Sequence, residues 1–334
     1  MGRLEPVHGG TDSLPEPRYD FSSNANPLGP CPSVLAAVRA ADLRLYPDPH
    51  YTRLRTRLAA FHGVSPDRVV VGAGASELIL RLIRRIPGTV QQLVPTFSEY
   101  ARGAKLSGRP LVSLRSPAGF LRAQVRHRGL GFLCWPNNPT GDCWPADFVR
   151  QAGKTGPLVL DLAYAPLCDP AEAAEIEGAA EAAYRLYSPN KAFGLTGVRG
   201  AYVIAPRGDP KLADAAPSWV IGREAVAFLE SCIEPRARTW LGGALPKVQQ
   251  LRAHLATSLQ QAGMAVRESP ATFLLANVGD AARVTTELRG RGIRVRDTSS
   301  FGLPQWIRLS GQPPDAQKAL LKALKALKAL KAAL

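Results

Sequence analysis

The segment YRLYSPNKAFGLTGVRGAY, residues 184–202, decides the fold, and it contains a single lysine, Lys191. Its short apolar run ends at Ser-Pro-Asn, which predicts a buried strand that stops at a turn. A lysine at such a turn is held rigidly and partly out of water. Because desolvation and a neighbouring cation, here Arg199, lower the pKa of an ammonium group, Lys191 is a candidate to form a Schiff base. By residue type alone a surface lysine is the more common case, so this interpretation depends on partner residues elsewhere in the chain.

The composition describes a large, basic, globular protein. The chain has 334 residues, of which 46% are hydrophobic, and this length favours two lobes. The 42 Lys and Arg residues exceed the 27 Asp and Glu residues, so the formal net charge is +15. Only 7% of residues are aromatic, and the densest basic run, residues 115–128, is interpreted as a solvated face, so we expect no nucleic-acid partner. A non-catalytic, basic nucleic-acid-binding protein is an alternative that explains the charge alone, and a scaffold that kept the fold without the chemistry is another.

The cysteines indicate a reducing compartment. They are five in number, scattered, and never spaced as Cys-x-x-Cys. Since the N-terminus also lacks an apolar signal segment, we expect a cytoplasmic protein. No uncharged apolar stretch is long enough to span a bilayer, and the five histidines show no ligand spacing with the cysteines, so neither a membrane nor a metal site is expected.

The chain is predicted to have an N-terminal arm and a large α/β domain. Residues 1–30 are rich in Gly, Pro, Asn and Ser, which predicts an extended arm that lies on another surface. Over residues 31–215 apolar strands alternate with helices, beginning with a helix over 33–41 that has Ser33 as its N-cap. Strands without period-2 polarity predict a mostly parallel sheet with helices on both faces. The predicted strands cover residues 68–72, 90–94, 110–114, 131–135, 157–161, 184–187 and 201–205.

Residues 216–334 are expected to form a smaller, C-terminal α+β domain. A long helical region over 219–261 precedes strands at 271–278, 293–296 and 306–310, with a helix at 281–291. The last stretch, 317–334, repeats Lys-Ala-Leu and has high helix propensity, so we expect a terminal helix. Because a strict three-residue period drifts around a 3.6-residue helix, no single apolar stripe is predicted on it.

Side chains with chemistry are predicted to gather at the carboxyl ends of the strands, where ligands bind in such sheets. A helix that begins at Ala75 and Ser76, after a glycine turn, presents free N–H groups and the positive end of its dipole, which suits a phosphate. Taken singly, each candidate has an ordinary explanation, because a carboxylate can cap a helix and an aromatic ring can pack in the core. The other candidates at strand ends are Phe97, Asn138, Asp161, Tyr164 and Lys191.

The order of these residues resembles that of fold-type I pyridoxal-phosphate (PLP) enzymes, the class I/II aminotransferase superfamily. There an N-P-T-G asparagine and a D-x-x-Y pair precede an S-x-x-K lysine, as WPNNPTG, DLAY and SPNK do here. The resemblance implies that Lys191 binds PLP and that Asp161 keeps the pyridine nitrogen protonated, so that the ring acts as an electron sink. It also implies that Asn138 and Tyr164 bind the ring oxygen and that Phe97 stacks on the ring. The cofactor phosphate is expected to bind the N–H groups of Ala75 and Ser76, the Ser188 hydroxyl and Arg199.

The chain departs from the superfamily pattern at three places. Asn190 precedes the lysine where relatives usually carry Ser or Thr. Leu162 stands where an acidic residue is common, and GVRGAY alters the usual order after Arg199. One phosphate contact is therefore expected to be weaker than in relatives.

Two families of the superfamily resemble nearly the whole chain: histidinol-phosphate aminotransferases and the threonine-phosphate decarboxylases of cobalamin biosynthesis. HGG at residues 8–10, DFSSNANPLG, PTFSEYARG and IRVRDTSSFGLPQWIRLS are similar to the decarboxylase pattern, whereas YPDP and NPTG are shared. The resemblance implies decarboxylation of L-threonine O-3-phosphate to (R)-1-amino-2-propanol O-phosphate, with transamination of histidinol-phosphate type as the alternative. The reactions differ in which Cα bond stands perpendicular to the ring, and composition does not report this.

The same resemblance implies a small, phosphorylated amino-acid substrate and a shared site. Arg308 matches the arginine that receives the substrate carboxylate, and Arg296 matches a second cation near the substrate phosphate, although either could be an ordinary strand arginine. His8 and Asn26 on the arm could complete that pocket, while packing of the arm explains His8 equally well. Tyr46, in YPDP, resembles a tyrosine that reaches the cofactor phosphate of a neighbouring subunit, which implies a homodimer. Alternatively, Tyr46 is an aromatic residue that packs at a turn.

Overall fold

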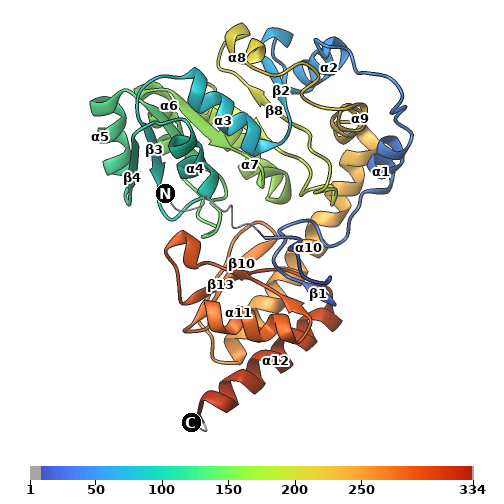
Figure 1. Cartoon of the computed structure of the whole chain (residues 1–334), viewed down its shortest axis with the longest axis vertical. Coiled ribbons are helices and arrows are strands. Elements are labelled where there is room, and N and C mark those ends of the chain that lie inside the picture. Colours follow the sequence, from blue (N-terminus) through green and yellow to red (C-terminus); the bar gives the residue numbers. More distant parts are fainter. Residues whose placement is uncertain (1–8, 333–334) are drawn as a thin grey trace.

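Two hydrophobic cores lie along the long axis of the computed structural model, which describes residues 9–332 (Figure 1). The larger core surrounds a seven-stranded sheet, and the smaller one surrounds a four-stranded sheet. Helices cover the strands in both. The predicted α/β class, with a large, mostly parallel sheet and a smaller α+β unit, is therefore confirmed.

The seven-stranded sheet has the order β2-β8-β7-β6-β5-β3-β4. Its neighbours pair in parallel except β8, which is antiparallel to both β2 and β7. β2, β5, β6 and β8 are buried along their whole length, as expected for strands covered on both faces. The strands are β2 (Val69–Gly72), β3 (Val90–Leu93), β4 (Leu111–Leu114), β5 (Leu130–Cys134), β6 (Leu158–Asp161), β7 (Tyr184–Tyr187) and β8 (Ala201–Ile204).

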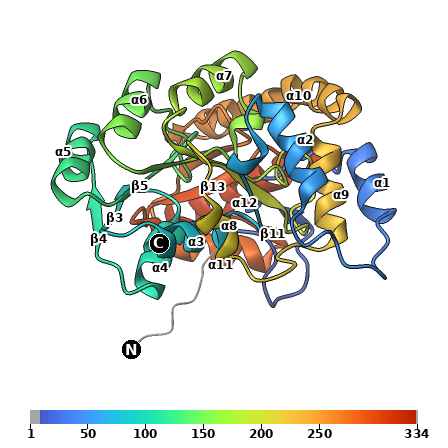
Figure 2. The ribbon, with the colours of Figure 1, turned by 90° about the horizontal axis from the view of Figure 1, so that it is seen from above.

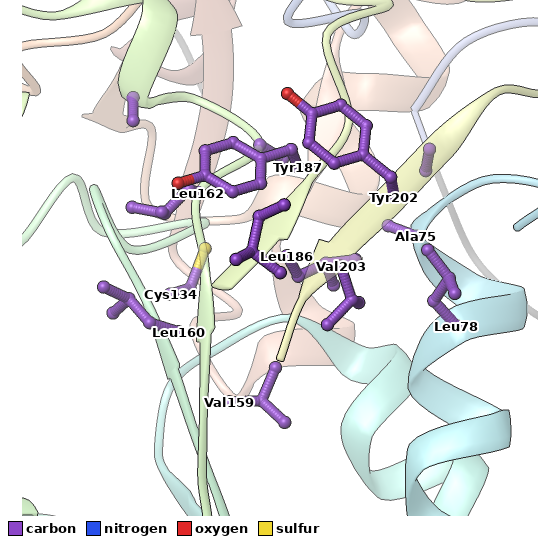
Figure 3. Packing of buried hydrophobic residues seen from close by; sticks show 14 of the residues in the cluster. Ala75, Leu78, Cys134, Val159, Leu160, Leu162, Leu186, Tyr187, Tyr202 and Val203 are labelled. Carbon is purple, nitrogen blue, oxygen red and sulfur yellow. The ribbon is translucent and has the colours of Figure 1, made fainter. Parts of the chain in front are cut away.

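Helices pack on both faces of this sheet, with α5, α6 and α7 on one side and α3 and α4 on the other (Figure 2). Leu186 of β7 and Val203 of β8 lie side by side in the core, and Leu78 of α3 packs near them (Figure 3). Burial of one such leucine stabilises the fold by roughly 2 kcal/mol. The helices are α1 (Pro32–Arg39), α2 (Thr52–His62), α3 (Ala75–Arg85), α4 (Ser98–Leu106), α5 (Pro117–His127), α6 (Ala146–Thr155), α7 (Pro170–Ala179) and α8 (Pro210–Asp214).

The basic run 115–128 is solvated as expected, because its arginines are exposed; the helix α5, which forms there and buries Phe120 against the core, was not predicted. The expected start of the first helix is wrong. The first helix begins at Pro32 with Cys31 as its N-cap, so the cap lies two residues before the expected Ser33. Proline at the first helical position is preorganised for a helix start, and this preference overrides the capping preference of serine.

The second sheet is antiparallel and has the order β12-β13-β10-β9. The predicted strand 293–296 is divided between two sheets, because β11 pairs with β1 whereas β12 pairs with β13. The elements are β1 (Tyr19–Asp20), β9 (Val266–Arg267), β10 (Phe273–Asn277), β11 (Ile293–Arg294), β12 (Arg296–Asp297), β13 (Trp306–Ser310) and α11 (Ala281–Gly290). Three short 3₁₀ turns complete the set: η1 (Pro66–Arg68), η2 (Ala165–Leu167) and η3 (Ser299–Phe301).

The helical region expected over 219–261 is two helices, α9 (Arg223–Cys232) and α10 (Pro235–Gln261). Pro235 lacks the N–H that a continuous helix needs and starts α10 as its first residue. The larger core takes in Leu241 and Leu245 of α10, and the smaller core takes in Leu255 and Leu259 of the same helix. The domain boundary at residue 215 stays a prediction, because α10 contributes residues to both cores.

The Lys-Ala-Leu segment forms the helix α12 (Pro314–Ala332). Contrary to expectation, its leucines do form a stripe, since Leu320, Leu324 and Leu327 are buried in the smaller core. These positions follow the i, i+4, i+7 spacing of one helix face, so the packed face takes only some of the leucines that the repeat supplies. No helix of the described residues is long and apolar enough to cross a membrane.

Candidate active site

A cavity of about 460 Å³ opens at the carboxyl ends of the strands and is lined by both the large and the small sheet regions. This volume lies within the range of small-molecule sites. Eleven of the predicted side chains line it, which confirms that the fold brings residues from distant motifs to one place. They are Ala75, Ser76, Phe97, Asn138, Asp161, Tyr164, Ser188, Lys191, Arg199, Arg296 and Arg308.

Asp161, the last residue of β6, is a buried carboxylate with 2% exposure. It accepts hydrogen bonds from the Tyr100 hydroxyl, at 2.9 Å, and from the Ala163 amide, at 3.1 Å. Burial raises the pKa of Asp161, and the Ala163 amide, the nearby Lys191 charge and the Tyr100 hydroxyl oppose that rise. Tyr100 was not predicted as a site residue, although it belongs to the PTFSEY segment that supplied Phe97. Such a carboxylate is held rigidly and suits a cationic partner in the cavity.

Lys191 lies in the loop after β7, and its amine is 5.1 Å from the centroid of the Tyr164 ring. The arm fixes this loop: the Asn26 amide N–H donates to the Lys191 carbonyl at 2.8 Å, and the Asn26 side chain donates to the Ala192 carbonyl at 3.1 Å. Asn26 is therefore a positioning residue for the lysine loop and does not line the cavity, which corrects its predicted contact with substrate. Its side-chain oxygen also accepts from the Leu28 amide, so the local turn directs it toward the backbone.

Asn24, two residues earlier, is a cavity residue that the sequence analysis missed. Its side-chain Nδ2 donates a hydrogen bond of 3.0 Å to the Tyr164 hydroxyl, and its side-chain oxygen Oδ1 is buried without a partner among the described residues. The only sequence signal is the repeated asparagine in DFSSNANPLG, and spacing alone does not tell which of the two enters the site.

The N-terminus of α3 and Arg199 form a cradle for an anion. Gly74 precedes the helix with φ = 90°, and a Cβ added there would come within 2.3 Å of the Arg199 Nη2. Glycine is thus required both for the turn and for the approach of the guanidinium to the free N–H groups of Ala75 and Ser76. The Ser188 hydroxyl, also in the lining, donates to Asn190 Oδ1 at 3.2 Å. Asn190 therefore ties the lysine loop together in place of the usual Ser or Thr.

Arg308 and Arg296 face the same cavity from neighbouring strands. They are direct register partners of β13 and β12. The Arg308 guanidinium donates to the Asn138 side chain and to the Ser22 carbonyl, and its Nε is buried without a partner in the described chain. Burial lowers the pKa of Arg308, and burial together with Arg308 lowers the pKa of Arg296 to about 10. Neither is the exposed strand arginine that was the alternative, because Arg308 is 5% and Arg296 4% exposed.

Two further predicted residues lie away from the cavity or outside the description. Tyr46 is 76% exposed and stacks on Trp219 with ring centroids 4.4 Å apart, so it does not contribute to the cavity of its own chain. His8 falls outside the described residues. Other lining residues that were not predicted come from the arm, from the last loop, and from the ends of the large-sheet strands and the loops after them: Gly9, Gly10, Thr11, Asp20, Ser22, Ser23, Phe301, Cys134, Ala163, Asn190, Thr196 and Gly197.

The residues present suit PLP on the chemistry of the donor set. A primary amine, a buried carboxylate and an anion cradle at a helix N-terminus lie in one cavity, and these suit the aldehyde, the pyridinium nitrogen and the phosphate of that cofactor. Among the described residues no group of His, Cys, Asp and Glu could hold a metal ion.

Solved structures of similar fold include a histidinol-phosphate aminotransferase from Clostridium acetobutylicum, with a TM-score of 0.84 and 23% identity over 93% of this chain and 99% of that one. The enzyme of the same name from Sinorhizobium meliloti, in complex with pyridoxal-5'-phosphate, gives 0.82 and 24% over 94% of this chain and 92% of the other. An L-threonine-O-3-phosphate decarboxylase from Porphyromonas gingivalis gives 0.78 and 23% over 92% and 99%. These identities show a shared fold.

Comparison of the sequences finds relatives with higher identity than these structures. A histidinol-phosphate aminotransferase from Archaeoglobus fulgidus is 31% identical over 91% of this chain and 97% of its own length. One from Nitratidesulfovibrio vulgaris is 32% identical over 91% and 87%. The pattern of the family described as aminotransferase class I and II matches residues 17–326. The chain therefore belongs to the class I and II aminotransferase family, whose cofactor is PLP.

Proposed function

We propose that this protein is a PLP-dependent decarboxylase that converts L-threonine O-3-phosphate to (R)-1-amino-2-propanol O-phosphate. The observation that carries the proposal is the pairing of Arg308 and Arg296, two buried guanidinium groups at the same register of adjacent strands, in one cavity. Two such cations suit a small substrate with two anionic groups close together, as the carboxylate and phosphate of threonine phosphate are. Histidinol phosphate has only the phosphate.

The predicted cofactor contacts follow from the placement of the side chains. Asp161 would hold a proton on the pyridine nitrogen, and Tyr164 and Asn138 would face the ring oxygen. Phe97 would cover the ring face. The phosphate would bind the α3 N-terminus, Ser188 and Arg199. When bound in this way, PLP supplies an electron sink for the bond that breaks at Cα.

The substrate contacts would choose the reaction. The bond that breaks is the one held perpendicular to the cofactor ring, so the residues that grip the carboxylate and the phosphate set the outcome. Arg308 would receive the carboxylate, because Asn138 and the Ser22 carbonyl hold its guanidinium. Arg296 would receive the phosphate. After loss of CO2 the Lys191 amine would deliver the proton to Cα as general acid.

The N-terminal arm, which lines part of the cavity, also favours the proposal of a small substrate. Residues of the arm segment 9–24 line the cavity, and the segment is anchored to β11, where Arg294 donates to the Gly10 carbonyl at 2.8 Å and pairs with Asp12 at 3.3 Å. An arm tied in this way would help to exclude water from the reacting bond. Its HGG and DFSSNANPLG segments are those that resemble the decarboxylase pattern.

Transamination of histidinol phosphate is the second candidate. The names of the 31% and 32% identical relatives favour it. We also propose a homodimer, since Tyr46 is exposed outside the cavity of its own chain and resembles a residue that contacts the neighbouring cofactor. Analytical ultracentrifugation tests the dimer, and a monomer at working concentration would refute it.

One experiment separates the two reactions. The purified protein, loaded with PLP, is given L-threonine O-3-phosphate alone, or L-histidinol phosphate with 2-oxoglutarate, and CO2 and glutamate are measured. The proposal expects CO2 from threonine phosphate and no glutamate. Glutamate without CO2 would make the protein an aminotransferase. A protein that binds PLP without turnover of either substrate would be a scaffold, and a protein without PLP absorbance that binds DNA with steep salt dependence would be the basic binding protein.

A further inference from the structure

A second cavity of about 560 Å³ lies behind the lysine loop, on the side of β7 and β8 away from the active site. We call it the rear cavity; Arg185, Tyr187, Tyr202, His62, Glu177 and Arg238 supply its polar lining. Ser188 lines both the rear cavity and the active-site cavity, so the loop that carries Lys191 borders both of them.

Arg185 lines the rear cavity, and its guanidinium lacks hydrogen-bond partners there in the described part of the chain. The residue is 9% exposed, yet its Nε has no hydrogen-bond partner, and no hydrogen bond or salt bridge joins its guanidinium to another side chain of the described residues. The buried Nε–H of Arg185 has lost its hydration without gaining a hydrogen-bond acceptor, which is unfavourable. A group that accepts from Arg185 inside the cavity would recover that cost.

The charges of the lining favour an anion with a single charge. Arg185 and Arg238 oppose one carboxylate, Glu177, which leaves an excess of one positive charge. Glu177 already accepts from the Tyr187 hydroxyl at 3.0 Å. His62 adds no charge near neutral pH, because burial and then the two arginines lower its pKa to about 3. A carboxylate would neutralise this excess, whereas a dianion such as phosphate would leave the lining with a net negative charge.

The walls of the cavity are aromatic. The Tyr187 and Tyr202 rings stack with centroids 5.0 Å apart, and Figure 3 shows them side by side beyond Leu186 and Val203. The His62 ring is 4.6 Å from Tyr187, and its Nε2 is 2.9 Å from the Tyr202 hydroxyl. Phe61 and Phe193 add two further rings, and aliphatic side chains such as Leu229 also line the cavity. Such walls suit a flat, apolar body of the ligand.

We propose that the rear cavity is a binding site for a small aromatic carboxylate, whose carboxylate binds Arg185 and whose ring lies against Tyr187 and Tyr202. The ligand would contact the Ser188–Pro189 end of the lysine loop from the side opposite the active site. This site is separate from the substrate cavity and does not depend on which reaction the enzyme catalyses.

The test uses 4-fluorobenzoate as probe, with its ¹⁹F signal followed by NMR on the full chain loaded with PLP. Saturable binding is expected, and the neutral 4-fluorobenzamide is expected not to bind. Because the probe could also enter the active site through Arg308, affinity is compared in Arg185→Met and Arg308→Met. We expect a loss of at least about tenfold in the first, the value of one charged hydrogen bond, and little change in the second. The visible absorbance of bound PLP reports that each variant is folded.

A matched pair of variants keeps the test valid if Arg185→Met fails to fold. Gly242 and Gly243 are adjacent, exposed residues of α10, and a Cβ on either has no neighbour within 4 Å, but only Gly242 lines the rear cavity. Gly242→Phe should block the probe, and Gly243→Phe should not. Absence of saturable binding would overturn the proposal. So would binding that Arg308→Met abolishes while Gly242→Phe leaves it intact, because the probe would then occupy the active site.

Discussion

The side-chain amide of Asn24 donates a hydrogen bond of 3.0 Å to the phenol oxygen of Tyr164, although 140 residues separate the two. Since the amide fills an acceptor position of the phenol, the Tyr164 proton is left to be donated into the cavity. The arm therefore sets the direction of a hydrogen bond that the proposed cofactor would receive. This contact links the N-terminal arm to the centre of the site.

The first prediction concerns this pair. Asn24→Ala and Tyr164→Phe should each lower kcat/KM for threonine phosphate by about tenfold, because each removes one oriented hydrogen bond. The double variant should lose much less than a hundredfold, since the second change removes an interaction that is already broken. Steady-state kinetics of the four proteins give the coupling. Fully additive losses would show that Asn24 does not act through Tyr164.

The second prediction concerns the buried carboxylate. Asp161→Asn should lower turnover by about 100-fold, because an amide cannot hold a proton on the pyridine nitrogen. The protein without PLP should be as stable at pH 7 as the parent, or more stable. The pKa of Asp161 is raised in the folded protein. At a pH above the ordinary pKa of an aspartate, ionisation of Asp161 therefore favours the unfolded state, and a neutral amide at this position removes that cost.

Thermal unfolding at pH 7 without the cofactor checks the stability half of this prediction. A marked fall in Tm would mean that the hydrogen bonds of Asp161 to Tyr100 and Ala163 outweigh the cost of its burial. The turnover half would be contradicted by a variant that keeps the activity of the parent.

The third prediction concerns the two arginines of the cavity. Arg308→Met should lower kcat/KM for threonine phosphate by at least about 30-fold, the lower limit for loss of a buried, hydrogen-bonded charge partner. Arg296→Met should chiefly raise KM for the phosphorylated substrate. Arg283→Met, an exposed α11 residue paired with Glu287, serves as control and should change neither parameter. Equal activity of Arg296→Met and the control would remove the phosphate role of Arg296.

The fourth prediction concerns stability at acid pH. The pKa of His62 is lowered from 6.5 to about 3 in the folded protein, so between these values the unfolded state binds a proton that the folded state does not. The contribution of His62 is fully present above pH 6.5 and is lost as the pH falls, by up to about 1.4 kcal/mol per pH unit.

Urea unfolding of the parent and of His62→Phe between pH 4 and 6 measures this difference. The dependence of the unfolding free energy on pH should be shallower in the variant by close to one proton. Loss of the hydrogen bond to Tyr202 will lower the stability of the variant at every pH without changing that dependence. Parallel curves for the two proteins would contradict the assignment.

The sequence predicted most of the side chains that line the cavity, because they come from short motifs that end strands. A parallel sheet brings all such ends to one edge, so order along the chain becomes proximity in space, as with Asp161 and Lys191. It did not predict the arm residues, since an extended segment has no periodicity that tells which side chain faces inward. Asn24 enters the site and Asn26 binds backbone, and only the packing of the arm decides between them.

The arm contacts also determine when the active site can form during protein synthesis. The Phe21 carbonyl accepts from the Ser310 amide at 2.9 Å, and the Thr272 hydroxyl donates to the Asn24 carbonyl at 2.9 Å across 248 residues. Contacts between such distant parts of a chain form late, because a long loop must close first. During translation the arm therefore cannot take its final place beside the cavity until β13 has left the ribosome. Occupation of the finished site by its cofactor would report that nearly the whole polypeptide has folded.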